Sequence, residues 1–131
     1  MSVAIATVPL LIFEAAGCLM ALPASEVGHL EKAAGSFIQT KGSEPSFDLG
    51  EYFGARATQG PWLRWSRATR SARLRVHRVV DVVPVAVTSL TAMPRLLRSH
   101  RRTHAFLAAG VRDSDVFLLL DPARLPESSC P

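Results

Sequence analysis

The chain lacks the residues and motifs from which most enzyme sites are built. Its 131 residues include two cysteines, one tyrosine and four histidines. The sequence contains no G-x-S-x-G elbow, no H-E-x-x-H pair and no glycine-rich phosphate loop, which excludes the usual signatures of hydrolases, zinc proteases and nucleotide-binding enzymes. No spacing of its serines and histidines links a nucleophile to a base. We therefore expect no catalytic residue, no cofactor and no enzymatic activity.

Too few cysteines are present for a disulfide-rich scaffold. Cys18 lies in an apolar run and Cys130 in a polar tail, at opposite ends of the chain. A single pair does not make the framework of a small secreted domain. Two free thiols in a reducing compartment is the interpretation that we favour, and one disulfide is the alternative.

Metal ligands at suitable spacing are missing as well. His100 and His104 lie four residues apart, but neither a cysteine nor an acidic pair completes a zinc set around them. Asp113, Asp115 and Asp121 lie in and after a turn and do not follow the loop pattern of a calcium site. We expect no metal site.

No apolar run is long enough to cross a membrane. Residues 1–13 imitate the apolar core of a signal sequence but lack its positively charged start. Glu14 ends this run well short of the roughly 20 apolar residues that a spanning helix needs. We expect a cytoplasmic protein with no direct membrane insertion.

Lysine is nearly absent, and arginine carries the positive charge in the middle of the chain. The net charge is +4, and residues 55–112 hold twelve arginines against the single acid Asp81. Residues 1–54 and 113–131 instead hold more acids than bases. Four of the arginines recur every three residues beside two tryptophans, namely Arg64, Arg67, Arg70 and Arg73 beside Trp62 and Trp65.

This arginine block supports a second interpretation of the function. Basic residues interleaved with aromatics are typical of a surface that binds single-stranded nucleic acid. A spacing of three, however, scatters side chains over both faces of a strand, and a charged outer hairpin face over buried tryptophans is the simpler interpretation. A basic β-barrel that binds nucleic acid through residues 64–78 is therefore the alternative function and not the preferred one.

Short strands separated by turn residues make up most of the chain. Alternation in residues 73–77 predicts a half-buried strand, and its loss at residues 79–83 predicts a bulge or a change of sheet. Evenly spaced short strands of this kind indicate an all-β barrel or sandwich. Three hairpins are predicted, which pair residues 8–14 with 18–22, 61–65 with 72–76, and 105–112 with 116–120.

Capping residues predict short helical segments between the strands. Asp48-Leu49 opens a short helix, and residues 24–27 suit a single helical turn. Asp121 followed by Pro122 is an N-cap with proline at the first helical position.

Read in order, these segments resemble the CheW family of chemotaxis coupling proteins. Members open with a strand pair that leads into an A-L-P-like stretch and a valine, as residues 21–23 and Val27 do here. An Arg-Gly turn and an Asp-Leu pair close their first half, and Lys41-Gly42 and Asp48-Leu49 stand in those places.

The second half of the chain carries the stronger part of the resemblance. Residues 75–87 match a V-D-x-V-x-x-V strand pair, and Met93-Pro94 matches the proline of the following loop. Residues 106–125 match a final hairpin with a leucine run and a D-P-x-x-L turn. The similarity covers nearly the whole chain and is strongest from Leu74 on.

The resemblance implies an all-β fold with short helices. In this fold two SH3-like five-stranded β-barrels intertwine and leave a groove between them. Residues 1–125 would form one CheW-like domain, with a first sub-barrel of about residues 8–54 plus exchanged strands and a second of about residues 61–120. Residues 126–131 would be a flexible tail.

The resemblance also implies a non-catalytic adaptor of a chemosensory two-component system. Such a protein couples a methyl-accepting chemoreceptor to a CheA-type histidine kinase. One barrel docks on the regulatory domain of the kinase, and the groove holds the helical cytoplasmic tip of the receptor. Carried over by position, Val27 and Leu30 would line the groove, and Lys41-Gly42 would occupy the place of the family's Arg-Gly turn.

Several departures from the family pattern affect the first half most. Lys41 cannot reproduce the planar, bidentate contact of an arginine. Residues 43–46 are polar and contain a proline where the family has valine and isoleucine, and the loop before Gly35 is shortened, which is compatible with an incomplete first barrel. His77 stands where the family usually has an acid. These changes are compatible with weakened or retargeted receptor binding.

Overall fold

The computed structural model describes residues 6–31, 45–96 and 103–125, and it describes residues 29–31 by their backbone alone. Most of these residues lie in strands, which confirms the expected all-β class. The strands are β1 (Thr7–Ala15), β2 (Cys18–Pro23), β3 (Val27–Glu31), β4 (Ser46–Asp48), β5 (Trp62–Arg67), β6 (Arg70–Arg75), β7 (Arg78–Ala86), β8 (Thr91–Ala92), β9 (Phe106–Arg112) and β10 (Asp115–Leu120). Short helical segments connect them, namely α1 (Leu49–Tyr52) and the 3₁₀ turns η1 (Ala24–Glu26), η2 (Val87–Ser89) and η3 (Pro122–Arg124).

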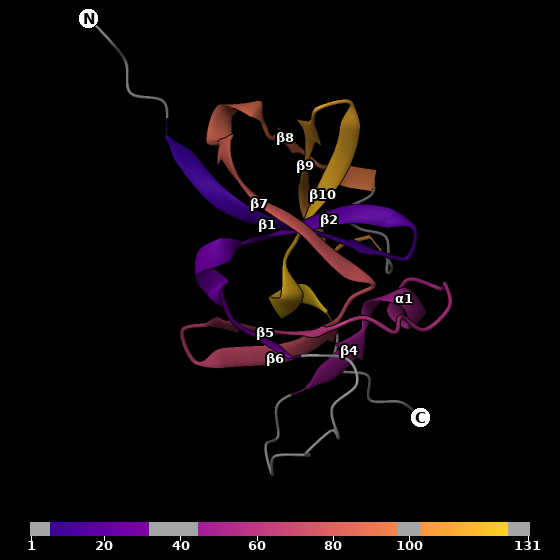
Figure 1. The fold of residues 1–131 in the computed structure, drawn as a ribbon. Coiled ribbons are helices and arrows are strands. Elements are labelled where there is room, and N and C mark those ends of the chain that lie inside the picture. The colour runs from indigo at the N-terminus through magenta and orange to yellow at the C-terminus, as the bar shows by residue number, and fades with distance from the viewer. Residues whose placement is uncertain (1–5, 32–44, 97–102, 126–131) are drawn as a thin grey trace, which may run out of the picture.

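The strands form two sheets, and the chain passes from one to the other and back. One sheet has six strands in the order β7-β1-β2-β10-β9-β8, and the other has four in the order β3-β5-β6-β4. The six-stranded sheet lies above the four-stranded one in Figure 1. The first two strands therefore share a sheet with the last four, and β3 to β6 form the other unit. The turn η1 is the point at which the chain first crosses between the sheets.

The first hairpin is confirmed, and it turns at Ala16 and Gly17. Both residues have positive φ angles, 54° and 76°, as in a two-residue turn whose twist matches that of the paired strands. Gly17 adopts this backbone without a steric penalty because it has no Cβ. Cys18 follows the turn as an exposed free thiol, and Cys130 lies outside the described residues.

The predicted irregularity in the valine-rich strand β7 is a bulge. Ile12 pairs with Asp81 and Phe13 pairs with Val79, so Val80 is the extra residue in the register. A bulge moves side chains to the other face of the strand, which explains why polar and apolar residues stop alternating here. Pro84 fits because β7 lies at the edge of its sheet.

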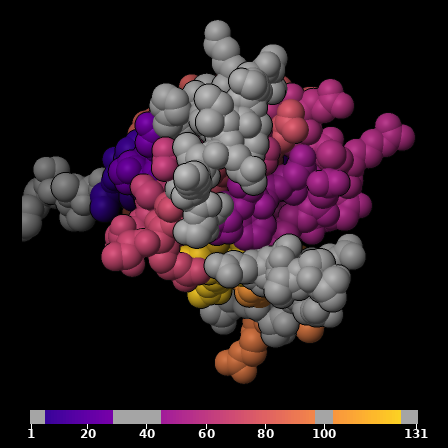
Figure 2. Space-filling model, turned by 90° about the horizontal axis from the view of Figure 1, so that it is seen from below, coloured from indigo at the N-terminus to yellow at the C-terminus, as the bar shows by residue number. Residues whose placement is uncertain are grey.

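Both predicted caps are present. One carboxylate oxygen of Asp48 accepts a hydrogen bond from the Glu51 backbone nitrogen at 3.2 Å, and both oxygens lie 3.0 Å from the Thr58 nitrogen. Asp121 accepts from the Ala123 nitrogen at 3.1 Å and caps η3. Seen from below in Figure 2, the yellow residues of this last described turn lie next to the magenta segment of β4 and α1.

The second hairpin is confirmed, but its turn is shorter than the sequence predicted. Strands β5 and β6 continue to Arg67 and from Arg70, which leaves Ala68 and Thr69 as the turn, with Ala68 at a φ of 52°. The last cross-strand pair of the hairpin joins Arg67 to Arg70, so both strands are longer than predicted. Arg73, an outward-facing residue in the alternation, is only 9% exposed.

The main core fills the space between the two sheets. Phe13, Met20 and Leu22 of the six-stranded sheet are buried in one cluster with Leu63 and Trp65 of the four-stranded sheet. A second, smaller cluster lies within the six-stranded sheet and consists of Leu10, Ile12, Ala21, Val85 and Phe117. Because the first core is shared, the two sheets are packed as one body.

Candidate partner-binding site

The candidate site lies where η1 crosses between the sheets and β3 begins. Val27 is half-buried and packs against the shared core. Its backbone N–H donates to the Ala24 carbonyl oxygen and closes η1. Leu30, two pairs further along β3, is in register with the buried Leu63 of β5. The crossing therefore fixes where this strand starts relative to the core.

The other two predicted site residues cannot be placed. Lys41 and Gly42 lie outside the described residues. Their grouping with Val27 and Leu30 stays a prediction.

Glu26, the residue before Val27, is held by donors from the four-stranded sheet. One carboxylate oxygen accepts from the Trp65 indole nitrogen at 2.8 Å. Arg67 donates to the same carboxylate through Nε at 2.9 Å and Nη2 at 3.1 Å. A planar guanidinium that binds both carboxylate oxygens fixes orientation as well as distance. The last residue of η1 is therefore fixed in orientation.

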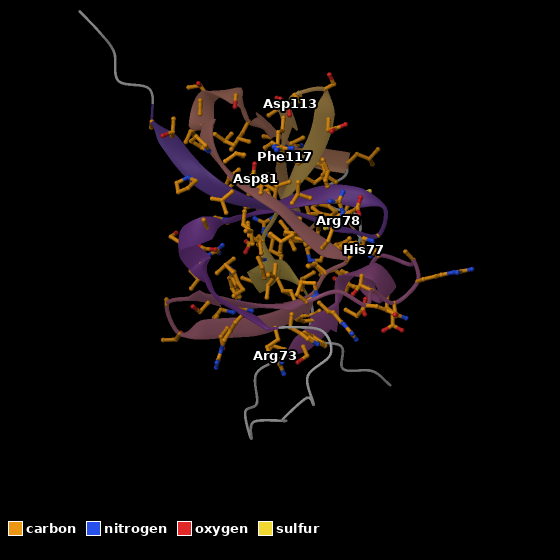
Figure 3. The ribbon with its side chains drawn as sticks, viewed as in Figure 1. Arg73, His77, Arg78, Asp81, Asp113 and Phe117 are labelled. Carbon is orange, nitrogen blue, oxygen red and sulfur yellow. The ribbon has the colours of Figure 1, made fainter. Side chains whose placement is uncertain are left out.

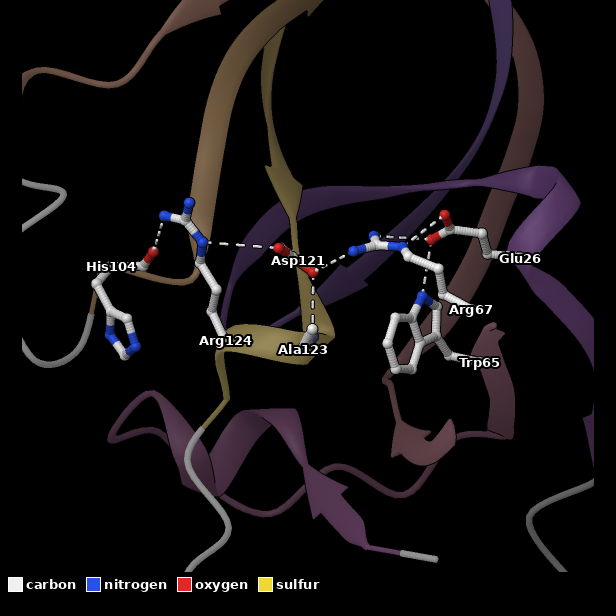
Figure 4. Close-up of polar contacts among 7 residues, drawn as sticks. All are labelled: Glu26, Trp65, Arg67, His104, Asp121, Ala123 and Arg124. Atoms are coloured by element: carbon white, nitrogen blue, oxygen red, sulfur yellow. Dashed lines mark hydrogen bonds and ion pairs between the residues drawn. The ribbon is translucent and has the colours of Figure 1, made fainter. Parts of the chain in front are cut away.

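The same arginine reaches the six-stranded sheet. Its Nη1 lies 3.1 Å from Asp121 Oδ1, and Asp121 follows β10 directly. Arg124 lies 3.6 Å from the other Asp121 oxygen and donates to the His104 carbonyl oxygen at 3.3 Å. Figure 4 shows this chain of contacts from Glu26 to His104. Arg67, at the end of β5 in the four-stranded sheet, thus links the carboxylate of η1 to the carboxylate that follows β10 of the six-stranded sheet, an arrangement that we call the Arg67 clasp.

The charges of the clasp support one another. Burial alone would raise the pKa of Glu26, but the hydrogen bonds from Arg67 and Trp65 and the charge of Arg67 outweigh it and hold that pKa below its ordinary value. The hydrogen bond to Glu26 raises the pKa of Arg67, against a smaller effect of burial, and Asp121 raises it further. Both groups therefore carry their full charge at neutral pH.

The structure uses much of the arginine block internally, which weakens the nucleic-acid interpretation. Trp65 is 1% exposed and cannot stack on a base. The guanidinium groups of Arg73 and Arg75 lie 5.0 and 5.6 Å from the centre of the Trp62 ring. Arg67 is engaged by two carboxylates. Trp65 and Arg67 are therefore not available to a nucleic acid, and Trp62, Arg64, Arg73 and Arg75 lie together on the other face of the hairpin.

His77, which stands where the resemblance places an acid, faces Glu14. Its Nε2 lies 3.7 Å from Glu14 Oε1, and the Arg78 Nε lies 3.1 Å from the same oxygen. Figure 3 shows His77 and Arg78 side by side where the chain enters β7. An acid at position 77 would be repelled by the negative charge of Glu14, whereas a histidine is not.

Two shallow cavities lie away from Val27. One of about 330 Å³ includes Glu14, Arg56 and His77 in its lining. The other, of about 390 Å³, lies between the start of β2 and the start of β10 and includes Cys18 and Val116. Neither combines the ligands of a metal, and within residues 6–31, 45–96 and 103–125 no three potential ligands come together. In the same part of the chain, no helix has the length and apolar character to span a membrane.

The assignment of Val27 to the partner-binding site stays a prediction, and the sequence did not reveal the Arg67 clasp beside it. Glu26 was part of a predicted turn, and Arg67 was one arginine among several. Their sequence separation is 41 residues, and Arg67 and Asp121 are 54 residues apart. The only local signal was Asp121, which was correctly assigned as a cap.

Comparison with known proteins supports the fold. No protein-family model matches the chain, and no curated protein matches its sequence. Fifteen chains among the solved structures do match. One of them is the crystal structure of scaffolding protein TtCheW from Thermoanaerobacter tengcongensis, with a TM-score of 0.70 and 18% sequence identity, covering 88% of this chain and 90% of that one. The chain therefore has the CheW-like fold that its motifs predicted.

Proposed function

We propose that the protein is a non-catalytic adaptor of a chemosensory signalling system. It binds the regulatory domain of a CheA-type histidine kinase and the helical cytoplasmic tip of a methyl-accepting chemoreceptor, and it holds the two together. Residues 1–125 act as one binding unit made of two sub-barrels. The observation that carries this proposal is the agreement of fold with a protein described as a scaffold, over nearly the full length of both chains.

The order of motifs along the chain supports the same role. An A-L-P stretch before Val27 leads into η1, and the D-P-x-x-L turn at the other end forms η3. The two turns are joined by the Arg67 clasp. Two of the motifs from which the resemblance was drawn, at the two ends of the chain, are therefore linked through Arg67.

The proposed mechanism is stoichiometric binding. An amphipathic helix of the receptor places its apolar face against Val27 and Leu30, as helix-in-groove recognition requires. Lys41 and Gly42 contribute to the rim, where charges govern specificity and the rate of association more than affinity. Neither partner is chemically changed.

Equilibrium binding to each partner tests the proposal. A labelled peptide of the receptor tip and the isolated kinase regulatory domain are titrated with wild-type protein and with variants Val27→Asp and Lys41→Glu. The matched control is Val111→Asp, because Val111 is a valine on β9 that is 67% exposed. Val27→Asp and Lys41→Glu should weaken receptor-tip binding while Val111→Asp does not. Wild-type protein that binds neither partner overturns the function, and unaffected variants overturn the site.

A further inference from the structure

We infer that Arg67 is a positioning residue for the receptor-binding edge, acting through Glu26 on Val27. The polar contacts of its guanidinium are with Glu26 and Asp121. It holds the carboxylate of the residue immediately before Val27, and it ties that carboxylate to Asp121, which follows β10 of the six-stranded sheet. The binding consequence of this inference rests on the proposed function, whereas the structural consequence does not.

The short turn η1 is where Arg67 can affect Val27. The turn consists of three residues and has no side-chain cap at its start, where Pro23 precedes it. Its end is closed by one backbone hydrogen bond, from Val27 to Ala24. A single 3₁₀ turn has little stability of its own. The side-chain contacts of Glu26 therefore add to the contacts of η1 with β1 and β5 that hold the turn.

Three donors hold Glu26, and Arg67 supplies two of them. Loss of Arg67 would leave only the Trp65 indole, with one oxygen free to rotate away. The Glu26 side chain is 20% exposed and the Asp121 side chain 11% exposed, so both carboxylates would be left poorly hydrated. Asp121 would keep its cap to Ala123 and its contact with Arg124. The disturbance should therefore fall mainly on η1 and Val27.

The shared core limits how far the effect spreads. Trp65 is 1% exposed and its ring packs in the main cluster, so it should stay largely covered without Arg67, whose guanidinium lies 5.2 Å from the ring centre. Arg67 lies at the end of β5 next to the turn of its hairpin, where removal of an exposed charge leaves the ladder intact. An Arg67 variant should consequently fold with a loosened η1.

The first test uses amide exchange followed by NMR and needs no partner. In Arg67→Met the Val27 N–H, which closes η1, should exchange at least several-fold faster than in wild type. The matched control is Arg70→Met, because Arg70 pairs with Arg67 across the hairpin and is exposed. Equal exchange at Val27 in both variants and wild type overturns the inference. If Arg67→Met does not fold, Glu26→Gln removes the charge at the same contact and is measured in its place.

The second test is a double-mutant cycle on receptor-tip affinity. Arg67→Met should weaken binding of the labelled peptide about tenfold, as expected for loss of preorganisation at one contact residue, and Arg70→Met should change it less than twofold. In a Val27→Ala background the effect of Arg67→Met should disappear, because the residue through which Arg67 acts has been truncated. A full tenfold effect in that background overturns the inference, since Arg67 would then act independently of Val27.

The two tests separate the inference from the proposed function. If wild-type protein fails to bind the receptor tip, the proposed function fails, and amide exchange at Val27 alone decides the role of Arg67. If wild type binds and Arg67→Met behaves like Arg70→Met in both measurements, the inference fails and the function stands.

Discussion

Gly110 and Phe117 are paired across the β9–β10 ladder, and the missing side chain at position 110 makes room for the Phe117 ring. A Cβ at position 110 would overlap that ring and lie 3.0 Å from Leu90 Cδ2. Phe117 is fully buried in the core of the six-stranded sheet.

Replacement of Gly110 by alanine should therefore destabilise the protein. Overpacking of a filled core costs about 1–3 kcal/mol, which chemical denaturation monitored by tryptophan fluorescence would detect. Gly28→Ala is the matched control, because a Cβ there meets nothing within 4 Å. Equal midpoints for the two variants would contradict the packing described for Phe117.

Asp48→Ala should also lower the free energy of unfolding, by about 1–3 kcal/mol. The carboxylate caps α1 and accepts the backbone N–H of Thr58, a residue that is 6% exposed. Its loss would leave that N–H buried without its acceptor. Asp115→Ala, at an exposed position at the start of β10, is the control and should change the unfolding midpoint little.

Glu26 should make stability depend on pH in the acidic range. Its pKa in the folded protein lies below the ordinary value of 4.5, so the folded state binds its proton less readily than the unfolded chain. The contribution of Glu26 is therefore fully present above pH 4.5 and is lost as the pH falls through the lower folded value.

Unfolding curves of wild type and Glu26→Gln, recorded from neutral pH down to about pH 3, measure this contribution. The difference in stability between the two proteins should shrink as the pH falls. A difference that stays constant, or grows toward acid, would contradict the sign of the pKa shift.

The arginine block should not bind single-stranded nucleic acid appreciably. Trp65 is buried and Arg67 is engaged by Glu26 and Asp121, while Arg73 and Arg75 lie over the Trp62 ring, so the block offers few of its rings and cations to a base. An electrophoretic shift assay with a labelled oligonucleotide should show no retardation at physiological ionic strength. Retardation that weakens steeply with added salt would revive the alternative function.

Local signals predicted the features of the fold that depend on a few neighbouring residues. The turn at Ala16 and Gly17 and the caps at Asp48 and Asp121 each follow from the conformational preferences of single residues. Loss of alternation at residues 79–83 predicted a bulge or a change of sheet, and the register shows a bulge at Val80. These features need no knowledge of the rest of the chain.

Contacts between residues far apart in the sequence could not be predicted from such local signals. The parallel pair between Leu19 of β2 and Phe117 of β10 joins distant parts of the chain, and no local pattern specifies it. The Arg67 clasp was missed for the same reason, because its partners are brought together by the sheets. Arg73 is buried although its alternation placed it outside, since it lies over the Trp62 ring. The family resemblance predicted the overall fold, which periodicity alone did not, but it specified no long-range strand pair.

The most direct test of the adaptor role is a bridging assay. The kinase regulatory domain is immobilised, and retention of the labelled receptor-tip peptide is measured with and without the protein. Retention of the peptide only when wild-type protein is present, and its loss with Val27→Asp, is the predicted result. Retention that does not depend on the protein, or absence of retention at saturating protein, would contradict the adaptor role.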